Sequence, residues 1–330
     1  MKEVQTIAVA ADEAGVRLDR WFRRRWPHLN QAQLQKLIRS GQVRVDGART
    51  KAEARLAGGA VVRVPPLPDP TSDPAPARPI DPREAVFARS LVLYEDDEVL
   101  ALNKPAGLAV QGGTKTLRHI DGLLGAWGEG LTRPRLVHRL DRDTSGVLVL
   151  GKSPQAAAKL AGAFARRKAQ KTYWAIVAGF PKPGEGILEL ALVKRGIGDR
   201  ELMVPAEPKD PRAELAETEF VTLARAGPRA AWMALRPRTG RTHQLRAHMK
   251  AMGHPILGDP KYGDDVSREL SGGLKLQLHA RRLVLPHPSR GVLTLEAPLS
   301  PEMRAGFEHF GFDEHEADPE PFGRDHRRQR

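Results

Sequence analysis

The chain is organised around the stretch His138-Arg139-Leu140-Asp141-Arg142-Asp143-Thr144-Ser145-Gly146, which runs directly into Val147-Leu148-Val149-Leu150. The four apolar residues at its end are typical of a strand that is buried on both faces. The turn before them places one carboxylate, Asp141, between two arginines at the entrance of that strand. From these residues alone, the turn is either a solvated charge cluster or a site of chemistry.

A nine-residue pattern in this stretch, His-Arg-Leu-Asp-x-x-Thr-Ser-Gly, resembles the signature of the RluA-type pseudouridine synthases. The resemblance places Asp141 at the position of that family's catalytic aspartate, which favours chemistry over a solvated cluster. It implies isomerisation of uridine to pseudouridine in RNA, a reaction that needs no redox step and no group donor. We therefore expect no cofactor and no metal. Whether Asp141 attacks C1′ of the ribose or removes the 2′ proton stays open.

Two downstream motifs extend the resemblance. The pair Lys171-x-Tyr173 matches an element in which the tyrosine lies in the pocket, where its ring could stack on a flipped uracil and its hydroxyl help to move a proton. The run from Thr239 to His248 matches the family's Gly-Arg-Thr-His-Gln-Leu-Arg-x-His motif. The resemblance pairs its second arginine, Arg246, with the catalytic aspartate, and Arg241 would hold the motif or contact a phosphate.

Two further basic residues are candidates for contacts with RNA. Arg139 projects from the catalytic turn and, by resemblance, would fill the gap that an extruded base leaves in its stack. The loop Asn103-Lys104-Pro105-Ala106-Gly107 resembles a family loop that leads toward the active site. Lys104 would either neutralise a phosphate there or lie on the surface beside a turn.

Acidic and histidine residues near the motifs also suggest other chemistry. His243 and His248 are five residues apart, which is a poor spacing for one helical face, and the chain has no cysteine. We therefore predict no metal site. Asp143 is expected to be structural, although a metal-dependent phosphodiesterase that uses Asp141 and Asp143 is an alternative. Sensitivity to a chelator would distinguish it.

Composition indicates the kind of partner. The 330 residues carry a formal net charge of +13, with a pI near 10.2, which favours a polyanion and above all a nucleic acid. No run of about 18 apolar residues occurs, and the N-terminal residues do not resemble a signal peptide. We expect a cytoplasmic, monomeric protein that binds RNA and neither DNA nor a membrane.

Much of the basic charge lies near the N-terminus, where residues 15–64 contain twelve lysines and arginines against three acidic residues. Apolar spacing predicts a helix over 16–26 that Pro27 ends, and a second helix over 31–40 that Asn30 caps. Strands are expected near 42–45 and 60–64, with a turn at Asp46-Gly47. The order resembles the alpha-L RNA-binding domain. A basic face is expected from Arg17, Arg20, Arg24, Lys36, Arg39 and Arg44; a solvated helix pair is the alternative.

The sequence predicts an α+β fold with a large, mostly antiparallel sheet and a central cleft, preceded by the small N-terminal module. We assign residues 1–64 to the RNA-binding module, 65–84 to a proline-rich linker, 85–312 to the catalytic domain and 313–330 to a disordered tail. In the catalytic domain we expect strands at 91–94, 99–102, 147–150 and 171–179, and a helix at 155–167 that Ser153 caps.

Within the family, the runs 103–113 and 138–148 are most similar to the RluC subgroup. This implies that the partner is large-subunit ribosomal RNA. A non-catalytic RNA-binding or ribosome-assembly protein on the same fold is the main alternative. The presence of Asp141, Tyr173 and Arg246 argues against it.

Overall fold

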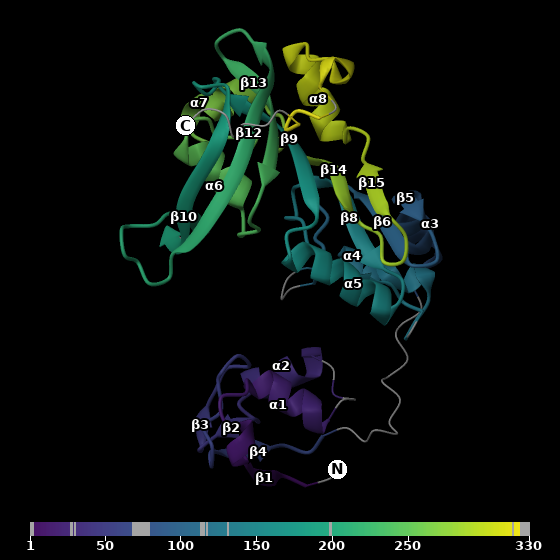
Figure 1. Cartoon of the computed structure of the whole chain (residues 1–330), viewed down its shortest axis with the longest axis vertical. Coiled ribbons are helices and arrows are strands. Elements are labelled where there is room, and N and C mark those ends of the chain that lie inside the picture. The colour runs from purple at the N-terminus through teal and green to yellow at the C-terminus, as the bar shows by residue number, and fades with distance from the viewer. Residues whose placement is uncertain are drawn as a thin grey trace. The chain divides into compact units, whose positions relative to one another are not determined.

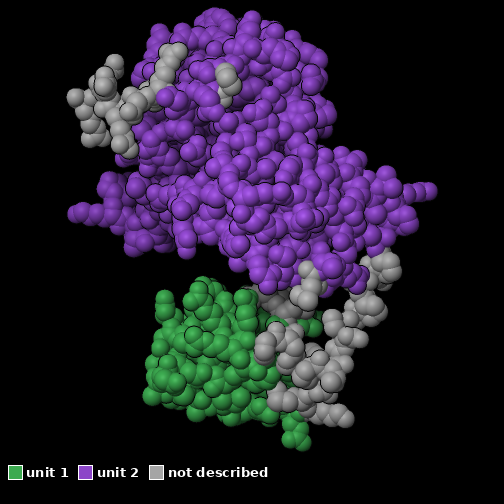
Figure 2. Space-filling view, turned by 45° about the vertical axis from the view of Figure 1, so that its right-hand side comes forward, with its two compact units in different colours: residues 1–79 green, residues 80–330 purple. Residues whose placement is uncertain are grey.

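The computed structural model describes residues 3–26, 29, 31–67, 80–112, 116, 118–130, 132–197, 200–318 and 320–323. The chain divides into two compact units, residues 1–79 and 80–330, which Figure 2 shows in different colours. Within the described ranges, no helix combines the length and the apolar character needed to cross a membrane.

The first unit contains two helices, α1 (Leu18–Arg25) and α2 (Gln31–Arg39), as the apolar spacing predicts. Pro27 and Asn30, the predicted helix end and cap, lie outside the described residues. The described strands form a four-stranded sheet in the order β1 (Gln5–Ala8), β4 (Val61–Val64), β2 (Arg44–Val45) and β3 (Ala48–Arg49). The turn at Asp46-Gly47 therefore joins β2 to β3, which the sequence analysis missed, and β4 pairs with the other edge of β2.

Aromatic side chains form the centre of this unit. Trp21 and Phe22 are fully buried, and their ring centroids lie 5.5 Å apart, so they are core residues as expected from their helical spacing. The same core includes Leu67, which is only 4% exposed. The compact module thus extends past the predicted boundary at residue 64, because an apolar side chain beyond the last strand still packs against it.

The second unit is built on one large sheet of eleven strands within the described chain. Its main path runs β11 (Arg200–Pro205), β10 (Glu185–Ile197), β12 (Glu214–Ala226), β13 (Ala230–Pro237), β9 (Gln170–Ala178), β14 (Leu278–Pro286), β8 (Ser145–Gly151), β6 (Val99–Lys104) and β5 (Val92–Glu95). In addition, β15 (Val292–Glu296) pairs with β14 and β7 (Arg135–Leu136) pairs with β8. Among the pairings between described strands, only that of β14 with β8 is parallel, which confirms the predicted mostly antiparallel sheet.

Helices cover the sheet in two groups (Figure 1). The strands β10, β12 and β13 lie with α6 (Gln244–Ala251) and α7 (Asp265–Ser271), and α8 (Pro301–Phe310) lies near β9. The strands β5, β6 and β8 lie with α3 (Pro82–Ser90), α4 (Ile120–Leu123) and α5 (Pro154–Ala165). Ser153 caps α5 as predicted, since its hydroxyl accepts a hydrogen bond from the N–H of Ala156 at 3.1 Å.

Strand β8 is buried at all seven positions, as its apolar sequence predicts. Gly146 has a φ of +108°, and a Cβ at this position would lie 2.2 Å from the carbonyl oxygen of Ala280. Only glycine therefore allows β8 to approach β14 so closely. Ser145 adds a buried hydrogen bond of 2.8 Å between its Oγ and Nδ1 of His279. These contacts fix the strand that follows the turn of Asp141.

The structure corrects the predicted end of the linker. Residues 82–84, assigned to the linker, form the first turn of α3. The carboxylate of Asp81 accepts a hydrogen bond from the N–H of Arg83 at 2.7 Å, and Pro82 occupies the first helical position. Proline is compatible with that position, because its missing N–H has no helical partner there. Residues 68–79 of the linker lie outside the described residues.

The predicted disorder of the C-terminal tail is wrong for residues 313–318 and 320–323, which pack on the second unit. Phe322 is only 8% exposed, and the guanidinium of Arg236 lies 4.4 Å from its ring centroid. Glu320 forms an ion pair of 2.7 Å with Arg282. Burial of one aromatic side chain is worth roughly 1.5–3 kcal/mol, enough to hold a short polar segment. Residues 319 and 324–330 lie outside the described part.

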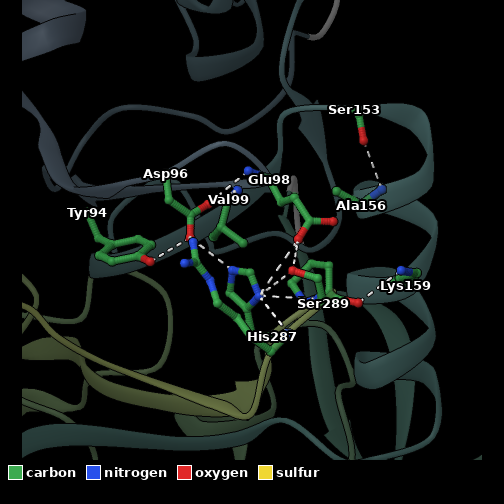
Figure 3. A network of polar contacts seen from close by, with 11 residues as sticks. Tyr94, Asp96, Glu98, Val99, Ser153, Ala156, Lys159, His287 and Ser289 are labelled. Atoms are coloured by element: carbon green, nitrogen blue, oxygen red, sulfur yellow. Dashed lines mark hydrogen bonds and ion pairs between the residues drawn. The ribbon is translucent and has the colours of Figure 1, made fainter.

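A dense polar network joins the β5–β6 turn to the hairpin between β14 and β15 (Figure 3). Its centre is the carboxylate of Asp96. The donors to this carboxylate are the hydroxyl of Tyr94 at 2.6 Å, the N–H groups of Glu98 and Val99 at 2.8 and 2.7 Å, Nε2 of His287 at 2.9 Å and Nη2 of Arg290 at 2.9 Å. The network fastens two connections that are almost 200 residues apart in the chain.

Candidate active site

The second unit contains a cleft of about 910 Å³. Side chains from five separate stretches line it: the turn residues 138–141 with 144, the end of α5 and start of β9 within 164–173, the β12 residues 217 and 219, the segment 236–246, and Leu278 of β14. The fold therefore brings together motifs that are about 100 residues apart in sequence. The cleft matches the predicted central cleft of the sheet domain.

The carboxylate of Asp141 lies in this cleft, with its side chain 21% exposed. The guanidinium Nη1 of Arg246 lies 3.7 Å from this carboxylate, and Nε2 of His243 lies 3.9 Å from it. Both distances exceed hydrogen-bond length. Among the described residues, none donates a hydrogen bond to this carboxylate. Asp141 is thus balanced in charge while its oxygen atoms keep free lone pairs that face an open cavity.

A second, fully buried carboxylate holds Arg246 in place. Nε and Nη2 of Arg246 donate to the two oxygens of Asp259 at 2.7 and 2.6 Å. Asp259 also accepts from the N–H groups of Lys261 and Tyr262. Burial works to lower the pKa of Arg246, but the hydrogen bonds and charge of Asp259, with a contribution from Asp141, raise it overall. The arginine therefore stays charged and presents its remaining nitrogen to Asp141.

Asp259 is a site residue that the sequence analysis did not single out. A signal was available, because a buried arginine on an apolar helix face requires a carboxylate partner. The sequence could not show which of several nearby acids would supply it.

His243 and Tyr262 complete this side of the cleft. His243 precedes α6 in a left-handed conformation with φ of +51°. Its Nδ1 lies 3.0 Å from the hydroxyl of Tyr262, which also accepts from the N–H of Met203 at 2.9 Å. Burial lowers the pKa of His243, and the negative charge of Asp141 only partly opposes this, so the imidazole is neutral at neutral pH. His243 had been considered only as a metal ligand.

The structure separates the two histidines of the motif. His248 is fully buried and does not line the cleft, whereas His243 does. In the part of the chain that the structure describes, no three His, Cys, Asp or Glu side chains are grouped so that they could hold a metal ion.

Tyr173 lies on β9 between Leu235 of β13 and Ala280 of β14, and it lines the cleft. Burial raises its pKa, and the negative charge of Asp141 raises it further. The phenol therefore keeps its proton at neutral pH and can donate a hydrogen bond. Tyr173 therefore lies in the pocket as predicted, and it is close enough to Asp141 for that charge to affect its pKa.

The two arginines with predicted RNA contacts differ in their surroundings. Arg139 is exposed and lines the cleft. Arg241 also lines the cleft, but its Nε donates to the carbonyl oxygen of Leu215 at 3.2 Å and its Nη1 forms an ion pair with Glu214 at 3.1 Å. Arg241 thus already ties the motif to β12.

The structure corrects both roles that were predicted for Lys104. It is fully buried, so it is neither a phosphate contact nor a surface lysine. Its Nζ donates to the carbonyl oxygens of Pro105, Leu108 and Arg142 at 2.9, 2.8 and 2.9 Å. Burial lowers the pKa of Lys104 to about 7, while the negative charges of Asp143 and Asp141 act in the opposite direction. The reason for its inward position is that Lys104 ends the buried strand β6, paired with Gly146 of β8.

The basic residues of the first unit do not all have the same role in the structure. Three of the six, Arg17, Arg20 and Arg24, line a small hollow together with Arg55. Arg17 is also held by Asp19 through two hydrogen bonds of 3.1 and 2.6 Å. The guanidinium of Arg44 donates to backbone carbonyls of Gly41 and Gly47, that of Arg39 donates to Gln35, and Lys36 is exposed.

Fold and cleft together define an enzyme of the pseudouridylate synthase class. Residues 98–251 match the family model described as RNA pseudouridylate synthase, and the chain belongs to this family. It is 37% identical over 314 residues to the ribosomal large subunit pseudouridine synthase C of Escherichia coli K12, which covers 90% of this chain and 93% of that protein. The protein of the same name from Vibrio vulnificus is 33% identical over 305 residues, covering 91% of this chain and 95% of that one.

A solved structure supports the same class. The human RNA pseudouridylate synthase domain containing 4 superposes with a TM-score of 0.58 at 27% sequence identity. The match covers 69% of this chain and 97% of the human chain. The resemblance first seen in nine residues around Asp141 thus extends over most of the chain.

Proposed function

We propose that this protein is an RNA pseudouridine synthase that isomerises uridines of large-subunit ribosomal RNA. The observation that carries the proposal is a carboxylate in an open cleft with no hydrogen-bond donor of its own within the described chain, beside a buried arginine. The printed names of the curated relatives point to the same substrate. We further propose that it acts in the cytoplasm as a monomer.

The reaction breaks the N1–C1′ bond of uridine, rotates the uracil and joins C5 to C1′. The hydrogen on C5 leaves to solvent and N1 gains a proton, so that product and substrate are isomers. Asp141 is the group that would act at the ribose, either on C1′ or on the 2′ hydrogen. Both routes need a carboxylate whose lone pairs are free, and no described residue donates a hydrogen bond to the carboxylate of Asp141.

The neighbours of Asp141 would then have supporting roles. Arg246 would balance the charge of Asp141, and Asp259 would hold Arg246 in position. Tyr173 would place its ring against the extruded uracil, and its hydroxyl would take part in the movement of the C5 proton. Arg139 would occupy the space left by the base, which must leave its stack at a cost of a few kcal/mol.

We propose that the first unit is an alpha-L RNA-binding domain that grips RNA through its basic residues. The hollow that Arg17, Arg20 and Arg24 line is the surface on which we expect the RNA backbone to bind. Each phosphate that these side chains neutralise would release counterions and make affinity depend on salt.

Release of tritium from C5 tests the function directly. A large-subunit ribosomal RNA transcript labelled with 5-tritiated uridine should lose tritium to water with the parent protein and lose none with Asp141→Ala. Asp143→Asn is the control, since Asp143 does not line the cleft and should leave turnover within about threefold. RNA binding without any tritium release by the parent protein would contradict the proposal and leave the non-catalytic RNA-binding alternative.

The hydroxyl of Tyr173 can be tested apart from its ring. Tyr173→Phe keeps the ring, so RNA affinity should be unchanged, while turnover falls about 100-fold, as expected when a group that transfers a proton is lost. Full turnover of Tyr173→Phe would limit the residue to stacking.

A further inference from the structure

The cations that line the cleft fall into two groups. Four of them have recorded carboxylate partners: Arg236 with Glu219, Arg238 with Glu217 and Glu219, Arg241 with Glu214, and Arg246 with Asp259 and Asp141. Three others, Arg139, Arg167 and Lys171, line the same cleft with no carboxylate partner recorded among the described residues. Arg139 already has a proposed role, so Arg167 and Lys171 are the cations that the reaction leaves unexplained.

Lys171 is the more unusual of the two. It lies two residues before Tyr173 on β9, so that both side chains are on the same face of the strand. Its side chain is only partly exposed, and burial lowers its pKa. An ammonium group that is partly removed from water without a counter-ion costs free energy in the isolated protein.

The charge of Lys171 also acts on His138, which lines the same cleft. Burial, with a smaller effect from Lys171, lowers the pKa of His138 to about 3. The ring of His138 stacks on Phe164 at 4.4 Å, and its Nε2 accepts a hydrogen bond from the N–H of Val149 at 2.9 Å. The imidazole is therefore neutral, and its position is fixed. Because this ring carries no charge, His138 does not balance the charge of Lys171.

Arg167 is held in a conformation that arginine rarely adopts. It follows the end of α5 with a φ of +57°, and the N–H of Lys168 donates to the carbonyl oxygen of Ala163 at 2.9 Å. Glycine is the usual residue at this position of such a helix end, and a residue with a Cβ is strained there. Arg167 is exposed, lines the cleft and bears this strain without a recorded partner in the described chain.

We propose that Arg167 and Lys171 form a binding site for phosphodiester groups of the RNA strand that flanks the target nucleotide, on the His138 and Phe164 side of the cleft. The inference rests on the proposed function, because it presumes that RNA enters this cleft. A phosphate would supply the counter-ion that Lys171 lacks. A compact ammonium and a forked guanidinium are both suited to phosphate oxygens, and neither can accept a hydrogen bond from a base.

Three matched variants test the site on a large-subunit ribosomal RNA transcript with tritium at C5 of uridine. Lys171→Met and Arg167→Gln each remove one charge from the cleft. Lys168→Gln is the control, because Lys168 is equally basic, exposed and adjacent in sequence but does not line the cleft. Lys171→Met and Arg167→Gln should each weaken RNA binding about 10-fold, mainly through KM. Each should also reduce the slope of log affinity against log salt by about 0.7, and Lys168→Gln should change affinity less than twofold.

Thermal unfolding without RNA separates a binding role from a structural one. If Lys171 is an uncompensated cation in the free protein, Lys171→Met should leave the melting temperature unchanged or raise it. A lower melting temperature, an unchanged salt slope, or equal losses in Lys168→Gln and Arg167→Gln would each overturn the site. Tritium release by the parent protein in the same assay would keep the proposed function intact in those cases, and its absence would instead contradict that function.

Discussion

Asp96 and Asp141 are two aspartates of the same unit, each beside an arginine and a histidine, yet their surroundings are opposite. The carboxylate of Asp96 accepts hydrogen bonds from five donors at 2.6–2.9 Å (Figure 3). The carboxylate of Asp141 has one cation, Arg246, at 3.7 Å and the imidazole of His243 at 3.9 Å, and it faces the cleft. The first has no lone pair left for a ligand, whereas the second has both charge balance and open lone pairs.

The comparison teaches that the number of donors, more than the identity of the neighbours, separates a structural carboxylate from a reactive one. Two lysines of the second unit show the same difference. Lys104 donates to three backbone carbonyls, and Lys171 has no recorded acceptor in the described chain. Saturated groups hold the fold together, and unsaturated groups in a cleft are available to a substrate.

The largest expected effect is on turnover at Asp141. Asp141→Asn keeps the size of the side chain and removes its charge, so tritium release should fall about 10⁴-fold, which corresponds to about 5 kcal/mol. The free energy of unfolding should change by no more than about 1 kcal/mol, because no donor is left unpaired and Asp259 still compensates Arg246. Urea denaturation measures this second quantity, and a large loss of stability would contradict the distinction between the two aspartates.

Substitution of Asp259 should lower both the stability of the fold and the turnover. Asp259→Asn would leave the buried guanidinium of Arg246 without its main counter-ion, which should lower the free energy of unfolding by about 3–5 kcal/mol. Turnover should fall as well, because Arg246 would no longer be held against Asp141. Asp264→Asn is a suitable control in urea denaturation, since that carboxylate lies at the surface end of α7. Equal stability of the Asp259 variant and the parent would show that Arg246 is satisfied in another way.

Asp96→Asn should have the reverse effect of Asp141→Asn. The variant would weaken the contacts with Tyr94, His287 and Arg290 and should lower the free energy of unfolding by about 2–3 kcal/mol. Tritium release at a temperature where the variant is folded should match that of the parent. A loss of turnover in the fully folded variant would show that this network also supports the cleft.

The smallest effect is a change in pH dependence. Burial acts to raise the pKa of Asp96, but the hydrogen bonds from Tyr94, the backbone N–H groups and His287 outweigh it and lower the pKa below its ordinary value. The resulting stabilisation is complete above about pH 4, the ordinary pKa of aspartate, and disappears as the pH falls through the lower folded-state pKa. The difference in stability between parent and Asp96→Asn should therefore shrink below about pH 4 in urea denaturation.

Much of the fold follows from local patterns. The apolar runs of 99–102, 147–150 and 171–179 predicted strands that the structure contains. Ser153 and Pro154 predicted the start of α5. Asp81 and Pro82 carried the same signal for α3, but the surrounding prolines were taken for a linker. The packing of Phe322 could not be predicted in this way, since a single aromatic residue in a charged tail does not show which residues it contacts.

The sequence by itself determined which residues could do chemistry, because the order of charged, apolar and turn-forming residues around Asp141 depends only on neighbours along the chain. The tertiary structure alone decided which of those residues are available. Three features depend on groups brought together from distant segments: the burial of Lys104, the pairing of Arg246 with Asp259, and the lack of a partner for Lys171 among the residues that the structure describes. Whether a charged atom is satisfied is a property of the space around it, and that space exists only once the sheet has formed.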